Sequence, residues 1–141
     1  MAKSEKQKLK LLYIIQCLME KTDEEHAVTT QEIIDYLALQ GITAERKSIY
    51  TDIDLLIDFG MDIIKKPGRS GGYTLASRQF ELAELKLLVD AVQSSKFITT
   101  KKSRELIGKL ETLCSKYEAT QLHRQVVVTN RNKAINENIY Y

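Results

Sequence analysis

Long hydrophobic runs, cysteine clusters and a strong net charge are all lacking from this sequence of 141 residues. The longest apolar run, residues 11–15, is far shorter than the about 20 residues that a transmembrane helix needs. The lysine-rich start before that run resembles a secretory signal, but Gln16 interrupts the run and no small-residue cleavage site follows. We therefore expect a cytoplasmic protein with no membrane partner.

Cysteine is scarce, and its placement excludes several kinds of site. Cys17 and Cys114 both lie among helix-spaced leucines, which favours buried thiols in a reducing compartment over a disulfide. With His26 and His123 they lack the close spacing of zinc ligands, so we expect no metal and no other cofactor. No nucleophile and base, and no pair of acids, are placed as catalysis requires, so we expect no enzyme and no catalytic residue.

The net charge of +2 excludes an argument from bulk basicity. Residues 1–72 contain ten Lys and Arg against twelve Asp and Glu, whereas residues 73–141 contain eleven against seven. A nucleic-acid surface must therefore come from the local placement of basic residues.

Glycine and proline are also few, and they gather in one place. The single proline and three of the six glycines lie in "KKPGRSGGYTLA", residues 65–76. The flanking runs 61–66 and 73–76 predict two antiparallel strands, with residues 67–72 as the loop of a β-hairpin. A phosphate-binding P-loop would need a lysine, then Ser or Thr, then a helix after its last glycine, and Gly72 leads into Tyr73 instead.

Helical periodicity before the hairpin predicts three helices and a very short strand at residues 27–28. Residues 11–18 carry an apolar stripe, which indicates a first helix. Thr29 and Glu32 have the spacing of a capping box at the start of a second helix, which Gly41 ends. Thr43 is the expected N-cap of a third helix, about residues 43–59, which ends at Gly60. The expected apolar faces are Ile33, Ile34, Leu37 and Ala38 in the second helix, and Ile49, Ile53, Leu56 and Ile57 in the third.

This order of elements predicts a mainly α fold with a small β-hairpin wing, a winged helix-turn-helix. In such a fold the third helix lies in the major groove of double-stranded DNA, and the wing, residues 65–73, lies on the backbone or in the minor groove. The residues expected to bind DNA are Arg46, Lys47, Ser48, Tyr50, Thr51, Lys65, Lys66, Arg69 and Ser70. Four lysines of the first helix are candidates for further phosphate contacts: Lys3, Lys6, Lys8 and Lys10.

The three aspartates of the third helix need a separate interpretation. Asp52 and Asp54 point apart on a helix, which argues against a metal site, and we expect Asp52 to pair with a neighbouring basic side chain. Asp54 and Asp58 are expected to lie away from the DNA groove.

Beyond the wing the pattern predicts a helical extension. Leucine stripes at residues 85–92 and 106–117 indicate two helices, and residues 125–129 favour a strand. We expect residues 1–77 to form the DNA-binding domain and residues 78–141 a helical linker that forms a homodimer.

The sequence resembles a known family of regulators. "KSIYTDIDLLIDFG", residues 47–60, followed by "MDIIKKPGRSGGYTL" is similar to the N-terminal winged helix of the WYL-domain transcriptional regulators, which are related to DeoR-type repressors. Thr51 stands where family members often carry arginine. The resemblance implies a transcriptional regulator whose effector ligand binds a downstream sensing domain, and the WYL signature of that domain is not in this chain.

Other interpretations remain open. The wing and the outer side of the third helix are solvated polar surfaces in many proteins, and Tyr50 can pack against the edge of the core. A winged helix can also serve as a protein–protein interaction module without DNA binding, which the acidic N-terminal half favours.

Overall fold

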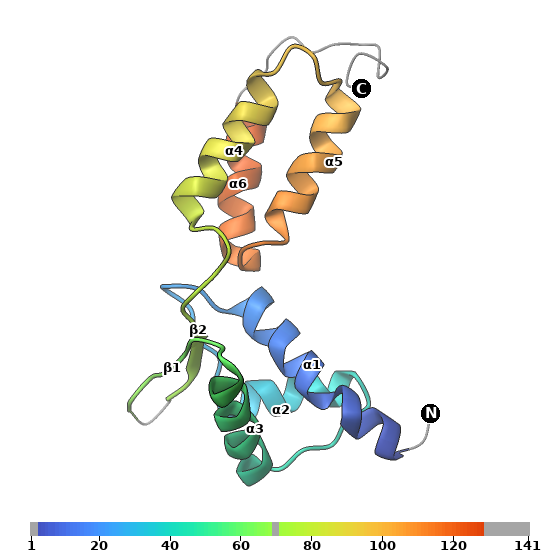
Figure 1. Ribbon diagram of the computed structural model, residues 1–141, viewed down its shortest axis with the longest axis vertical. Coiled ribbons are helices and arrows are strands. Elements are labelled where there is room, and N and C mark those ends of the chain that lie inside the picture. The colour runs from blue at the N-terminus through green and yellow to red at the C-terminus, as the bar shows by residue number, and fades with distance from the viewer. Residues whose placement is uncertain (1–2, 69–70, 129–141) are drawn as a thin grey trace. The chain divides into compact units, whose positions relative to one another are not determined.

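A computed structural model describes residues 3–68 and 71–128 of the chain. The chain divides into two compact units, Met1–Ser77 (unit 1) and Arg78–Tyr141 (unit 2). Among the described residues, unit 1 contains one long helix, two shorter helices and a hairpin, and unit 2 contains three helices. Figure 1 draws these elements in chain order.

Unit 1 is a winged helix-turn-helix. Its elements are α1 (Lys3–Lys21), α2 (Thr30–Leu39), α3 (Arg46–Phe59), β1 (Ile63–Lys65) and β2 (Tyr73–Leu75). Helices α1, α2 and α3 surround a common core, and the two strands form the hairpin at its side. The fold class predicted from the sequence is confirmed, including the helical extension that unit 2 supplies.

The start of α2 forms as its sequence predicts. The Thr29 hydroxyl accepts from the backbone N–H of Glu32 at 3.1 Å, and the Glu32 carboxylate accepts from the backbone N–H of Thr29 at 3.1 Å. Gly41 follows the helix with φ +78°, a conformation that residues with a Cβ rarely adopt, and this ends α2.

The start of α3 differs from the prediction, because Thr43 is not its N-cap. Ile42 is buried in the core, and its backbone N–H donates to the carbonyl of Leu37, which fixes the chain just after the turn. The chain then continues to Glu45, which is extended (φ −106°, ψ 156°), and the helix begins at Arg46. Burial of Ile42 therefore outweighs the local capping preference of Thr43, and Glu45 takes the N-cap position instead.

The wing is joined to the helices by a third short segment. Ile63 pairs with Leu75, Ile64 with Thr74 and Lys65 with Tyr73 in antiparallel register. Val28, in the segment before α2, exchanges two backbone hydrogen bonds with Tyr73, of 3.0 and 2.7 Å. The predicted short strand at residues 27–28 is thus a single bridge, and it holds the hairpin beside the start of α2.

The core of unit 1 follows the predicted stripes with two exceptions. Ile33, Leu37, Ile49, Ile53 and Leu56 are buried, together with residues of α1 and the hairpin. Ile57 is 38% exposed and Ala38 is exposed, so the prediction of both as core residues is wrong. Tyr36 of α2, which the prediction did not include, is buried in the core with Ile33 and Leu37.

The described part of unit 2 contains α4 (Leu82–Ser94), α5 (Thr100–Glu111) and α6 (Lys116–Val128), each of which packs against the other two. Its core is Leu85, Val89, Ile107, Cys114 and Leu122. The second predicted stripe, residues 106–117, spans two helices that a turn separates.

The predicted strand at residues 125–129 is wrong, because residues 125–128 belong to α6 and Thr129 lies outside the described residues. The β-branched run there favours a strand locally, but Val126 packs against the helical core and its carbonyl accepts from the Gln93 amide at 3.2 Å.

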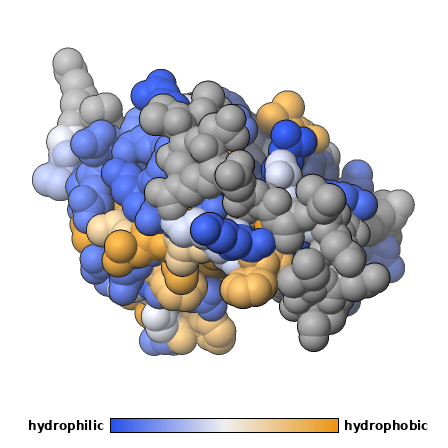
Figure 2. Space-filling view, turned by 90° about the horizontal axis from the view of Figure 1, so that it is seen from above, coloured by the Kyte–Doolittle hydropathy of each residue, from blue (hydrophilic) through white to orange (hydrophobic). Residues whose placement is uncertain are grey.

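Large apolar side chains also reach the surface of unit 2, including Leu87 and Phe97. Figure 2 shows hydrophobic patches that interrupt a mainly hydrophilic surface on the face in view. Within residues 3–68 and 71–128, no helix has the length and hydrophobicity that crossing a membrane requires.

Candidate nucleic-acid interface

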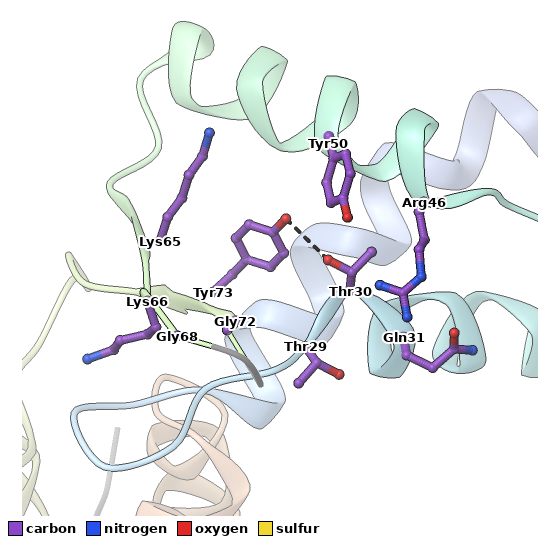
Figure 3. Close-up of a pocket in the computed structure, with 11 residues that line it drawn as sticks. Thr29, Thr30, Gln31, Arg46, Tyr50, Lys65, Lys66, Gly68, Gly72 and Tyr73 are labelled. Atoms are coloured by element: carbon purple, nitrogen blue, oxygen red, sulfur yellow. Dashed lines mark hydrogen bonds between the residues drawn. The ribbon is translucent and has the colours of Figure 1, made fainter.

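A depression of about 490 Å³ lies where α2, α3 and the wing meet (Figure 3). Its lining comes from all three elements: Thr29, Thr30, Gln31, Arg46, Tyr50, Lys65, Lys66, Gly68, Gly71, Gly72 and Tyr73. Three of these residues are basic and none is acidic. The depression therefore gathers positive charge on one face of a chain that is nearly neutral.

The helical period distributes the polar residues of α3 over three sides. Because successive residues turn by about 100°, residues four apart lie along the same side. The buried side carries Ile49, Ile53 and Leu56. The remaining positions form a wing side (Arg46, Tyr50 and Asp54), an outward side (Lys47, Thr51 and Asp58) and an α1 side (Ser48 and Asp52).

The wing side of α3 forms one wall of the depression. In Figure 3, Arg46 extends toward Gln31, and Tyr50 points its hydroxyl into the depression. Tyr50 is 46% exposed, so its ring is available to a ligand rather than buried in the core. These two predicted site residues come together with the wing as expected.

The α1 side of α3 turns away from this face. The Lys10 ammonium donates to the Ser48 hydroxyl and lies 2.7 Å from an oxygen of the Asp52 carboxylate. Lys10 and Asp52 are mostly buried, which confirms the expected basic partner of Asp52. Ser48 and Lys10 thus lie in an interhelical contact, and not on the open surface where the sequence placed them.

The outward side of α3 is open to solvent. Lys47 and Thr51 are both exposed in its first turns, where the sequence predicts them. The Thr51 hydroxyl donates to the backbone carbonyl of Lys47 at 3.1 Å, and its remaining lone pair can still accept a hydrogen bond. Asp58, also exposed, lies two turns further along.

The two lysines of the wing have different partners. The Lys65 ammonium lies 2.7 Å from the Asp54 carboxylate of α3, and this hydrogen bond and its charge raise the pKa of Lys65. Lys66 is exposed, and its backbone N–H donates to the Gly72 carbonyl at 2.8 Å, which closes the wing loop. Arg69 and Ser70, the other predicted wing residues, lie outside the described residues.

The lysines that begin α1 are not equivalent either. Lys8 is exposed, and Lys6 lies half-buried beside Gly41, whereas the side chain of Lys3 lies outside the description. Of the described ones, Lys6 and Lys8 stay available as candidates for phosphate contacts.

Residues at the start of α2 complete the site, and the sequence prediction missed them. Thr30 and Gln31 form the first turn of α2 and line the depression. The Thr30 hydroxyl lies 3.3 Å from the Tyr73 hydroxyl, and both side chains are buried, so this contact ties the wing to the helix. The capping box could have indicated these residues, because it marks the start of a helix, where the first backbone N–H groups have no partner within the helix.

Gly72 brings the wing close to the segment before α2. Its φ is +135°, and a Cβ there would lie 3.0 Å from the Val28 carbonyl oxygen. A larger residue would push the hairpin away from α2, so glycine at this position shapes the depression.

The comparisons with known proteins bear on the same part of the chain. No curated protein and no solved structure matches it. Residues 12–68 match the family described as FokI, D3 domain, a DNA-binding family of winged-helix-like domains. This is not the WYL-type family that the sequence resembles, and the match covers less than half of the chain, from α1 to the wing. Over that region the chain is similar to a DNA-binding domain.

Proposed function

We propose that this protein is a sequence-specific transcriptional regulator that binds double-stranded DNA through unit 1. The observation that carries the proposal is the convergence of α3, the start of α2 and the basic wing on one depression that has no acidic lining residue. In this proposal α3 enters the major groove and the wing lies along the backbone or in the minor groove.

The outward side of α3 would read the bases. The first turns of a recognition helix reach base edges, and Lys47 and Thr51 are the exposed residues there. Lysine donates to the O6 and N7 acceptors of guanine, and a threonine can contact several bases. Lys47 is therefore the residue we expect to contribute most to sequence choice.

The depression would hold the phosphate backbone. Arg46 lines it from α3 and Lys66 from the wing, and the first turn of α2 lines it with Thr30 and Gln31. Such contacts position a protein on the duplex without selecting its sequence. The Tyr50 hydroxyl can donate a hydrogen bond to a phosphate of the same DNA strand.

Two binding experiments test this proposal. Affinity for a random-sequence 30-base-pair duplex, measured over a series of salt concentrations, should fall linearly on a log–log plot. Arg46→Met should flatten the slope by about 0.9 because one phosphate contact is lost. Lys47→Met should change the sequence that the protein enriches from a randomised duplex library. Binding that is absent, or that does not depend on salt, would refute the proposal.

The proposal also includes a response to an effector ligand and dimerisation through unit 2. The resemblance to WYL-domain regulators supports a cytoplasmic regulator whose effector is bound by a sensing domain outside this chain. Unit 2 would form a homodimer, and the exposed Leu87 and Ala91, one turn apart on α4, support this contact. Sedimentation at a concentration of about 50 µM should show a dimer that Leu87→Glu dissociates. A monomeric wild-type protein would refute the dimer.

A protein–protein interaction module is the second candidate. The later turns of α3 expose Leu55 and Phe59, which are four residues apart, and Phe59 is 82% exposed. An apolar pair on the helix that should enter DNA favours a protein partner. Absence of duplex binding by the wild-type protein would favour this second candidate. If DNA is the partner, Phe59→Ser should leave the salt-dependent binding to the duplex unchanged.

A further inference from the structure

The wing presents two consecutive lysines, Lys65 and Lys66, whose charges are in different states. Lys65 forms an ion pair of 2.7 Å with Asp54. Among the residues that the structure describes, none forms an ion pair with Lys66. From the sequence, each lysine counts as one positive charge. In the structure, Asp54 compensates the charge of Lys65, whereas no ion pair with a described residue compensates the charge of Lys66.

The geometry of the strand separates the two side chains. Successive residues of a strand point to opposite faces, and Lys65 is the last residue of β1. In Figure 3, Lys65 extends toward α3, whereas Lys66 points away from that helix. Asp54, on the wing side of α3, meets Lys65 there.

We propose that Asp54 shields Lys65 from the DNA, so that Lys66 contributes to phosphate neutralisation and Lys65 instead positions the wing against α3. The inference rests on the proposed function, since it concerns the same DNA surface. It makes Asp54 a positioning residue that limits binding to DNA of any sequence.

The ion pair should persist beside DNA because of what its rupture would leave behind. If Lys65 moved to a phosphate, the carboxylate of Asp54 would stay uncompensated next to a polyanion, and that repulsion would offset the new contact. The pair also loses little hydration, because the two side chains are 55% and 63% exposed. Both effects favour the intramolecular partner.

Shielding should change the affinity for DNA and not the choice of sequence. Binding to random sequence depends almost entirely on the number of neutralised phosphates, whereas specific binding adds base contacts. A lysine withheld from the backbone therefore weakens binding to every sequence by a similar factor and leaves the base-reading side of α3 unaffected.

The experiment measures the affinity of the full chain for a random-sequence 30-base-pair duplex at several KCl concentrations. The variants are Asp54→Asn, Lys66→Met and the double variant Asp54→Asn with Lys65→Met. Lys66→Met should flatten the log–log slope by about 0.9. The double variant should keep the wild-type slope, because it removes a pair that is already neutral. Asp54→Asn alone should steepen the slope by about 0.9. With equal affinities at 1 M salt, the variant should then bind the random duplex about eightfold more tightly than the wild type at 0.1 M salt, because ten to the power 0.9 is about eight.

Two results would overturn the inference. The first is a double variant that flattens the slope as Lys66→Met does, because this would show that Lys65 leaves Asp54 for a phosphate in the complex. An unchanged slope in Asp54→Asn would show that no charge was withheld. Wild-type binding that does not depend on salt would instead refute the proposed function itself, and the inference with it. All three positions are exposed, and matched thermal unfolding curves would confirm that every variant folds.

Discussion

Replacing Lys10 by methionine should strongly destabilise unit 1. The Lys10 ammonium contacts both Ser48 and Asp52, and the side chains of Lys10 and Asp52 are only 10% and 15% exposed. Removing one partner of a fully buried ion pair leaves an uncompensated charge and costs about 3–5 kcal/mol. Methionine keeps the aliphatic stem, and some water reaches both groups here, so we expect a loss of about 2–3 kcal/mol.

Thermal and urea unfolding of the full chain measure this loss. A change of 1 kcal/mol shifts the melting temperature of a domain of this size by about 4–8 °C, so the midpoint of unit 1 should fall by about 10–20 °C. Unit 2 contributes helical signal of its own, and amide hydrogen exchange in α1 and α3 assigns the change to unit 1. Lys8→Met is the matched control, because Lys8 is exposed on the same helix and should change stability by less than about 0.5 kcal/mol.

A second substitution tests the cause of the loss. Asp52→Asn in the Lys10→Met protein removes the uncompensated carboxylate, so the double variant should be more stable than Lys10→Met alone. If Lys10→Met lost no more stability than Lys8→Met, this result would show that water alone is enough to solvate the Asp52 carboxylate. The interpretation that this contact stabilises the packing of α1 against α3 would then be wrong.

Three further substitutions test other parts of unit 1. Gly72→Ala should cost about 1–3 kcal/mol in urea unfolding, because of its positive φ and the nearby Val28 carbonyl, and more than Gly68→Ala, whose Cβ would meet no atom within 4 Å. Thr29→Ala should cost about 0.5–2 kcal/mol by loss of the cap, whereas Thr29→Ser should cost little, and equal losses would contradict the role of the hydroxyl. Burial raises the pKa of the Cys17 thiol from 9.0 to about 11, so its contribution to stability is complete below pH 9 and is lost as the pH rises through 11. Between pH 9 and pH 11 the Cys17→Ala variant should lose less stability than the wild type. Equal losses in the two proteins would show that the ionisation of the thiol is not linked to unfolding.

Local signals in the sequence predicted most of unit 1. The capping box at Thr29 and Glu32 depends on residues three apart, and the ends of α2 and α3 depend on Gly41 and Gly60. The hairpin follows from its loop composition. Each of these features is decided within a few residues, so a sequence pattern is enough to find it.

Contacts between distant residues were not predictable in the same way. Lys10 is 38 residues from Ser48, and only the packing of α1 against α3 brings them together. The start of α3 depends on the burial of Ile42, and α6 depends on the fit of Val126 against α4 and α5. In both cases tertiary packing decides against a local preference, for a cap at Thr43 and for a strand near residue 126.

The acidic balance of residues 1–72 argues less against DNA binding once two of the three aspartates of α3 are placed. Asp52 faces α1 and is paired with Lys10, and Asp54 is paired with Lys65 at the edge of the wing. Neither of these two charges is left uncompensated on the proposed DNA-binding surface, although both count fully in the net charge of the sequence, and the exposed Asp58 lies two turns beyond Thr51. Helical spacing thus lets a nearly neutral chain expose a cationic surface, because what DNA meets is the uncompensated charge at its contact face and not the sum over all residues.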